Sequence, residues 1–419
     1  INLEWIRRSF SSISFLGRII KLSQPEFAPF PVSEYERRVA KARHLMEENG
    51  IDALVLTSKE NVVYFSGIQT IGWDSKHRPL IVIVPRELSS PVHMVLAESL
   101  YQVSRESSWV DELRPWGGWM EGSTEDPIVG ALQVFQDLGL VTGKLGFELG
   151  YGQRMGMSQE DYFELVEQLP EASLVDGSKL IWELRMIKSS LEIEALREAC
   201  AATTSAFEKG FAAIYPGMKE KELSGIMFSE MARYTDERPG FMMVRSGPRK
   251  YRMANVLAFD KPMVAGELVV VDSGAVYKDY WSDFMRMCSI GEPTKEQRRF
   301  FDATLESQQA GVDKMKPGVT AHDIFSACND VLVAHGLADY VTFERLGHGV
   351  GLDMHEPPSM ARGSELIIQP GMVLTVEPVF WDRPEGKVGN FALEDVVVVT
   401  EEGHEVLSLF PKDLHIVPV

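Results

Sequence analysis

The chain has few of the features that mark secreted, nucleic-acid-binding or membrane proteins. Its 419 residues include three cysteines, an odd number spread far apart, so a disulfide framework is not expected and a reducing compartment, the cytoplasm, is favoured. Basic residues are the minority, with 42 lysines and arginines against 61 acidic residues and a net charge of −19. This excess of acid argues against nucleic acid or an anionic membrane as a partner.

Residues 1–31 also lack a long hydrophobic run. Their apolar stretches are interrupted by Arg7, Arg8, Arg18 and Lys21, and are too short for a transmembrane span or for the core of a secretory signal. We expect an amphipathic arm that packs on its own domain or on a dimer partner. An organellar presequence is the alternative.

What the sequence does contain, from residue 32 onward, is an alternation of helical and strand patterns. Residues 35–49 have helical spacing and end before Gly50, which is typical of a helix with a glycine C-cap. The apolar runs 53–56 and 81–84 predict buried strands, so we expect an α/β domain over residues 32–180.

A second domain is expected over residues 181–419, because 419 residues with 45% hydrophobic composition can form two cores of ordinary size. The boundary should fall near residues 176–188. Capping boxes predict that helices begin at Ser189, Thr294 and Thr320, the first of them running to about Ala213.

Acidic residues end several apolar strands in the last third of the chain, and a histidine between glycines accompanies them. Any one of these acids, taken alone, is typical of a solvated strand end or a turn. A buried carboxylate without a partner is costly, however, and four of them with one imidazole predict a pair of divalent cations that balances their charge. The five residues are Asp272, Asp283, His348, Glu377 and Glu394.

The order of these motifs resembles metallopeptidase family M24, which contains methionine aminopeptidase, aminopeptidase P, prolidase and creatinase. The motifs are Asp-x-Gly at 272–274 with a second Asp eleven positions after the first, Gly-His-Gly at 347–349, Glu-Pro at 377–378 and Leu-Glu-Asp at 393–395. The resemblance runs from about residue 32 to the end. It implies a pita-bread fold for the second domain, with a curved, mostly antiparallel sheet backed by helices, and it implies a homodimer.

The same resemblance implies roles for the site residues. The five residues would hold two metal ions, with Asp283 and Glu394 bridging them, and Mn, Co, Fe or Zn all suit oxygen-rich ligation with one imidazole. A water that bridges two cations loses its proton readily, which predicts a hydrolase using a bridging hydroxide. Glu377 would double as the acid/base, and His355 would stabilise the tetrahedral intermediate or the substrate. A structural histidine is the alternative for His355.

Two further residues are candidates for substrate binding. In relatives of the creatinase type an arginine near residues 75–79 reaches across the dimer to the substrate carboxylate, which makes Arg78 a candidate; a solvated loop arginine is the alternative. Seventeen positions before Asp272, where metal-dependent relatives carry a histidine that contacts substrate, this chain has Asn255. Its amide can form hydrogen bonds but cannot exchange a proton at neutral pH.

Other departures from the family pattern leave the substrate open. Ala392 replaces an arginine that supports the carboxylates, and Met285 replaces a threonine before Arg286. The first hypothesis is a metal-dependent hydrolase of a short peptide or amino-acid amide, nearest to an Xaa-Pro dipeptidase. The second is a creatinase-type enzyme acting on a small carboxylated nitrogen or sulfonium compound, and the third is a non-catalytic binding module. We expect residues 235–252 and 379–390 to be loops that shape the pocket.

Overall fold

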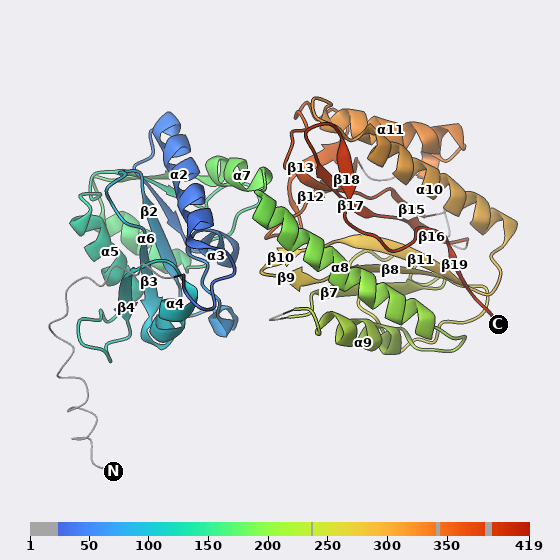
Figure 1. Ribbon diagram of the computed structural model, residues 1–419, viewed down its shortest axis with the longest axis horizontal. Coiled ribbons are helices and arrows are strands. Elements are labelled where there is room, and N and C mark those ends of the chain that lie inside the picture. The colour runs from blue at the N-terminus through green and yellow to red at the C-terminus, as the bar shows by residue number, and fades with distance from the viewer. Residues whose placement is uncertain (1–23, 236–237, 341–343, 382–387) are drawn as a thin grey trace, which may run out of the picture.

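The computed structural model describes residues 24–235, 238–340, 344–381 and 388–419, and Figure 1 shows them as two bodies of helices and strands connected through α7 and α8. The arm expected over residues 1–31 lies mostly outside these ranges. Within them, no helix combines the length and hydropathy needed to span a bilayer.

The N-terminal domain is built on a six-stranded sheet in the order β4-β3-β2-β1-β5-β6. Its strands are β1 (Ala53–Leu56), β2 (Ile81–Pro85), β3 (His93–Ala97), β4 (Glu112–Trp116), β5 (Lys144–Phe147) and β6 (Ser173–Asp176). β2 runs antiparallel to β1 and β3, whereas β1–β5, β3–β4 and β5–β6 pair in parallel. The two strands predicted at 53–56 and 81–84 are confirmed as β1 and β2.

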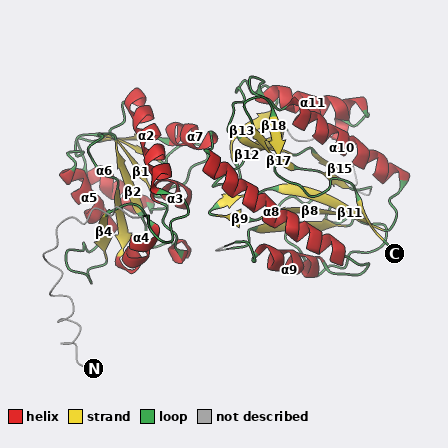
Figure 2. Cartoon of the chain, viewed as in Figure 1, coloured by secondary structure: helices red, strands yellow, loops and turns green. Residues whose placement is uncertain are grey.

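Helices pack on this sheet, as Figure 2 shows in red. They are α2 (Val32–Asn49), α3 (Lys59–Ser66), α4 (Tyr101–Ser107), α5 (Pro127–Asp137) and α6 (Gln159–Gln168), with short 3-10 turns at Ile71–Asp74 and Glu98–Leu100. The predicted first helix begins three residues early, directly after Pro31, and ends as expected at Gly50, whose φ of 60° suits glycine.

The second domain carries two main sheets. A four-stranded sheet has the order β19-β11-β8-β7 and a five-stranded sheet has the order β13-β12-β14-β17-β18. All their neighbours pair antiparallel except β11 and β19. The strands of the first sheet are β7 (Phe241–Ser246), β8 (Leu268–Gly274), β11 (Phe284–Ile290) and β19 (His415–Val417). Those of the second are β12 (Arg345–Gly349), β13 (Glu356–Ala361), β14 (Val373–Val376), β17 (Asp395–Val399) and β18 (His404–Val406).

Two short ribbons complete the strands, β9 (Val276–Tyr277) with β10 (Tyr280–Trp281) and β15 (Val379–Trp381) with β16 (Asn390–Ala392). The first ribbon contains the turn expected between Asp272 and Asp283, and Lys278 and Asp279 adopt positive φ there.

The helices of this domain lie outside its sheets, with α10 and α11 on one side and α8 and α9 on the other (Figure 1). They are α7 (Ser178–Met186), α8 (Ser190–Ala213), α9 (Glu220–Met231), α10 (Lys295–Lys314) and α11 (Ala321–Ala334), with a 3-10 turn at Ala338–Tyr340. The capping boxes predicted at Ser189, Thr294 and Thr320 are all formed. The division placed at residue 180 remains a prediction, and it falls inside α7.

The prediction that residues 235–252 and 379–390 form loops is wrong in part. Residues 241–246 form β7, an edge strand paired with β8 over six positions, because Phe241, Met243 and Arg245 face one side while Met242 and Val244 enter an apolar cluster on the other. Residues 379–381 and 390 belong to the β15–β16 ribbon, held by the buried stack of Phe380 on Phe391.

Candidate metal centre and active site

The five predicted ligands lie in or next to the ends of strands from both sheets of the second domain. Asp272 is in β8 and Asp283 directly precedes its antiparallel partner β11, while Glu377 directly follows β14 and Glu394 directly precedes β17. Since Val376 pairs with Asp395, the same register continued by one residue puts Glu377 beside Glu394. The two sheets meet here, because the Glu394 N–H donates to the Met285 carbonyl at 3.3 Å.

His348 brings the imidazole to these carboxylates. Its Nε2 lies 3.4 Å from Glu377 Oε1, 3.7 Å from Asp283 Oδ2 and 4.0 Å from Glu394 Oε1. Potential ligand atoms of Asp272, Asp283 and Glu394 all lie within 4.8 Å of one another, as do those of His348, Glu377 and Glu394. Glu394 therefore belongs to both groups, the position that a residue shared by two ions occupies.

The chemistry of the donors fits cations. Within the described ranges, Oδ1 of Asp272 and both carboxylate oxygens of Glu394 are buried without a hydrogen-bond partner. Buried polar atoms are rarely left in that state, because desolvation without a new partner is costly. Four carboxylates and one imidazole match the charge and the ligand preference of two divalent cations. The residues present fit a dinuclear site, and the identity of the metal is not fixed by them.

The protonation state of His348 suits a ligand. Its Nδ1 lies 2.9 Å from the Gly349 carbonyl, so Nδ1–H donates there and the lone pair of Nε2 faces the carboxylates. Burial lowers the pKa of His348 to about 3. The ring is therefore neutral at physiological pH, as metal binding requires.

The carboxyl groups are shifted in the opposite direction. Burial raises the pKa of Asp272 to about 6 and that of Glu377 to about 7. The pKa values of Asp283 and Glu394 are raised further, first by burial and then by the neighbouring acids. Without cations Asp283, Glu394 and part of the Glu377 population therefore hold protons near neutral pH, and cation binding would release them.

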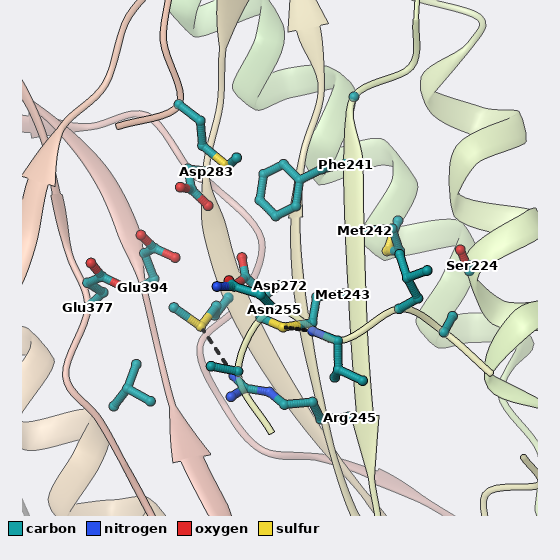
Figure 3. Close-up of a pocket in the computed structure, with 18 of the residues that line it drawn as sticks. Ser224, Phe241, Met242, Met243, Arg245, Asn255, Asp272, Asp283, Glu377 and Glu394 are labelled. Carbon is teal, nitrogen blue, oxygen red and sulfur yellow. Dashed lines mark hydrogen bonds between the residues drawn. The ribbon is translucent and has the colours of Figure 1, made fainter. Parts of the chain in front are cut away.

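A cavity of about 720 Å³ opens onto this cluster. Figure 3 shows Asp272, Asp283, Glu377 and Glu394 along one side of it, with Phe241, Met243 and Arg245 projecting from β7. The exposed His355 also lines it, and its ring centroid lies 4.2 Å from that of His348. Burial lowers the pKa of His355, which keeps this ring neutral.

The neighbour of His355 is anchored from far away in the chain. Glu356 is buried and accepts hydrogen bonds from Arg185 and from Lys188 Nζ at 2.8 Å. Burial alone would raise its pKa, but Lys188 and Arg185 hold the pKa at about 2. This ion cluster fixes the backbone beside His355.

The two predicted substrate contacts are placed differently. Asn255 lines the cavity and adopts a φ of 51°, a conformation that asparagine tolerates better than most residues. Arg78 is exposed in the N-terminal domain, where its Nη1 donates to Ser99 Oγ at 3.3 Å, and it does not line this cavity. Its role in a neighbouring active site therefore stays a prediction.

Ala392 and Met285 are both buried, and so is Arg286, which follows Met285 in β11. Arg286 Nη1 donates to the Glu394 carbonyl at 2.6 Å, and its Nη2 pairs with Asp395 at 2.7 Å. The segment that carries Glu394 is thus supported by Arg286, although the arginine expected at position 392 is absent.

Three cationic residues of the cavity were missed from the sequence: the exposed Lys221, Arg245 in β7 and Arg345 at the start of β12. The alternation Phe241, Met243, Arg245 is a period-two signal that a strand assignment would have exposed. Arg345 is exposed, and no motif distinguishes it.

Comparisons with known proteins agree with this geometry. Residues 194–401 match the family described as metallopeptidase family M24, and residues 38–187 match the creatinase/prolidase N-terminal domain. The chain is 29% identical over 379 residues to an Xaa-Pro dipeptidase of Pyrococcus furiosus, covering 90% of this chain and 99% of the relative.

It is also 30% identical to the uncharacterized peptidase YqhT of Bacillus subtilis, over 90% of this chain and 99% of that one. Among solved structures, an Xaa-Pro dipeptidase from Bacillus anthracis superimposes with a TM-score of 0.78 at 27% identity, covering 91% of this chain and 99% of the other. These matches confirm the predicted fold class of an α/β N-terminal domain followed by a pita-bread domain. The chain belongs to metallopeptidase family M24 and is an enzyme of that family.

Proposed function

We propose that the protein is a metal-dependent dipeptidase, nearest to the Xaa-Pro dipeptidases, that cleaves the amide bond of a short substrate. The observation that carries the proposal is the set of buried carboxylate oxygens that have no partner among the described residues, at one wall of a cavity of about 720 Å³, with Nε2 of His348 3.4 Å from Glu377 Oε1. Relatives named Xaa-Pro dipeptidase support the choice of substrate.

The proposed mechanism assigns each group a task. Two divalent cations bound by Asp272, Asp283, His348, Glu377 and Glu394 would activate a water molecule and polarise the scissile carbonyl. Glu377 accepts a proton on its carboxylate and passes it to the leaving nitrogen, as an acid/base beside the activated water would. His355, neutral and at the cavity surface, donates a hydrogen bond to the carbonyl oxygen as negative charge develops there.

We further propose manganese among the metals used, a homodimer and a cytoplasmic location. The three cysteines are all buried and free, which suits a reducing compartment. The dimer would give Arg78 a role in the partner's cavity, since it does not line its own.

Asn255 favours a second candidate, a creatinase-type enzyme acting on a small carboxylated nitrogen compound. Its neutral amide lines the cavity where peptidases of the family carry a histidine, so a proton-exchanging group is missing from that wall. The third hypothesis, a binding module without chemistry, is set aside because the chain is an enzyme of family M24 and retains all five ligand types.

The test is a substrate panel on protein stripped of metal and reloaded with Mn²⁺ or Co²⁺. It contains dipeptides with and without C-terminal proline, and creatine-like amidines. We expect about two ions per chain by elemental analysis and turnover of dipeptides. Turnover of an amidine alone would favour the second candidate, and full activity in metal-free protein would overturn the proposal.

A further inference from the structure

Residues 254–258 form one wall of the cavity, and we call them the wall segment. All five line the cavity, and none belongs to a helix or a strand. Among the described residues, two hydrogen bonds hold the wall segment to the rest of the protein. The Val256 N–H donates to Met243 Sδ at 3.4 Å (Figure 3), and Lys250 Nζ donates to the Leu257 carbonyl at 3.1 Å. Because a thioether is a weak acceptor, the bond from the Lys250 ammonium is the stronger of the two.

Lys250 is itself buried, with 4% of its surface exposed. Besides the Leu257 carbonyl, its Nζ donates to the Val244 carbonyl at 2.7 Å and to the Glu220 carboxylate. An ammonium group has three donors, so these three bonds use all of them. The side chain therefore joins the wall segment to β7 and to the first residue of α9.

Glu220 completes this connection from α9. It is fully buried, and its Oε1 accepts hydrogen bonds from the Ser246 N–H at 3.1 Å and from Ser246 Oγ at 2.6 Å. Its Oε2 accepts the N–H of Phe259, which directly follows the wall segment, at 3.0 Å. The Phe259 ring lies 4.7 Å from Lys250 Nζ, a contact in which an aromatic face attracts a cation. The Lys250–Glu220 ion pair thus fixes the end of the wall segment.

The position of Asn255 depends on the backbone of the wall segment. Its side chain is exposed and has no hydrogen-bond partner among the described residues, and its backbone adopts a φ of 51°. No neighbouring side chain holds the amide, so the backbone alone sets its place in the cavity. A displacement of about 1 Å caused by a distant substitution can cost an enzyme about 100-fold. A residue that fixes the wall segment therefore controls how the cavity meets its substrate.

We propose that Lys250 is a positioning residue of this site, which acts through the Leu257 carbonyl and holds Asn255 and its neighbours where they contact the substrate. The inference rests on the proposed function and deepens it, because it names a residue outside the cavity that governs substrate binding. Lys250 does not line the cavity, so it touches neither the substrate nor the predicted metal ligands. Loss of its bond to Leu257 releases the wall segment from β7, which weakens substrate binding and leaves the metal centre unchanged.

Two variants separate positioning from stability. Lys250→Met removes the bond to the wall segment, but it leaves Glu220 as a buried charge without a partner, which destabilises the fold. The double variant Lys250→Met with Glu220→Gln removes both charges, so it should regain part of the thermal midpoint that the single variant loses. Lys261→Met is the control, because Lys261 follows shortly after the wall segment, pairs with Glu267 at 2.7 Å and does not line the cavity.

Kinetics of the metal-loaded proteins use the compound of the substrate panel that wild type turns over best. We expect the single and the double variant to raise KM by about 10- to 100-fold, with kcat within about twofold of wild type. Lys261→Met should keep the wild-type KM. A double variant that regains stability and the wild-type KM together would show a purely structural lysine and overturn the proposal. An unchanged KM in Lys250→Met, a loss confined to kcat, or an equal rise of KM in Lys261→Met would also overturn it.

Limited proteolysis tests the wall segment without turnover. Chymotrypsin cleavage after Leu257, whose surface is 70% exposed, is followed by mass spectrometry well below the thermal midpoint of each protein. We expect cleavage at least about tenfold faster in both Lys250 variants, because release of the segment allows it to enter the protease, and the wild-type rate in Lys261→Met. Equal rates in wild type and the double variant would overturn the proposal. Faster cleavage in the variants, with no dipeptide hydrolysed by wild type, would overturn the proposed function alone.

Discussion

Removal of metal should make the protein less stable as the pH rises, and Glu377 allows this effect to be measured. Burial raises the pKa of Glu377 from its ordinary 4.5 to about 7 in the metal-free fold. Such a group keeps its proton in the native state after the unfolded chain has lost it, so native stability is full below pH 4.5 and falls until about pH 7. At about 1.4 kcal/mol per pH unit the loss reaches about 3 kcal/mol.

Two features of the site adjust this figure. The Glu377 side chain is 17% exposed, so solvent lowers the loss to about 2 kcal/mol between pH 5 and pH 8. His348 acts with the opposite sign, since its pKa is lowered to about 3 and its stabilising contribution is lost as the pH falls below 6.5. Comparison with a Glu377→Gln variant cancels His348 and the groups distant from the site, and it reports Glu377 together with its effect on the pKa values of Asp283 and Glu394, which its charge raises.

The assay is denaturant unfolding of chelator-treated wild type and Glu377→Gln at pH 5 and pH 8. Wild type should lose about 2 kcal/mol more than the variant over this interval. Glu365→Gln, at an exposed position, is the control and should follow wild type. Added Mn²⁺ should restore wild type more at pH 8 than at pH 5. Parallel pH profiles for wild type and Glu377→Gln would refute the assignment of a buried, protonated carboxyl.

Three further predictions concern other residues of the site. Asp283→Asn should abolish turnover and lower the amount of bound metal, because an amide replaces a carboxylate that belongs to two groups of potential ligands. Elemental analysis and kcat measure these effects, and unchanged turnover with bound metal would contradict the prediction. Arg78→Ala should raise KM for a carboxylated substrate with little change in kcat, and an unaltered KM would exclude Arg78 from any active site. Glu356→Gln should lower the free energy of unfolding by about 3 kcal/mol, because Arg185 and Lys188 lose a buried counter-charge. Denaturant unfolding that shows a loss below about 1 kcal/mol would contradict the last of these.

Much of the fold followed from local sequence signals. Capping boxes fixed the starts of α8, α10 and α11, and Gly50 fixed the end of α2, because each signal satisfies backbone groups within a few residues. The convergence of the five ligand types was predicted from motif order. The register of the sheet then brings Glu377 and Glu394 side by side, because β14 pairs with β17, about twenty residues further along the chain.

The features of the fold and the site that could not be predicted depend on contacts between distant segments of the chain. Phe241–Ser246 is a short edge strand with two methionines and an arginine, and only its pairing with β8 reveals which side chains face the cavity. The exposed position of Arg78 and the pairing of Arg185 with Glu356, 171 residues away, have no local signature either.

The anchoring of Glu356 by Arg185 and Lys188 has a consequence for the modularity of the chain. Both cations stand at or just beyond the end of the segment that matches the N-terminal family domain, yet their counter-ion belongs to the catalytic half. If the catalytic half began at residue 189, alone or behind a foreign N-terminal domain, it would lack Arg185 and Lys188. The backbone beside His355 would then lose the ion pairs that hold Glu356. A chimera that exchanges the N-terminal domain should therefore keep residues 185–188 together with the catalytic half.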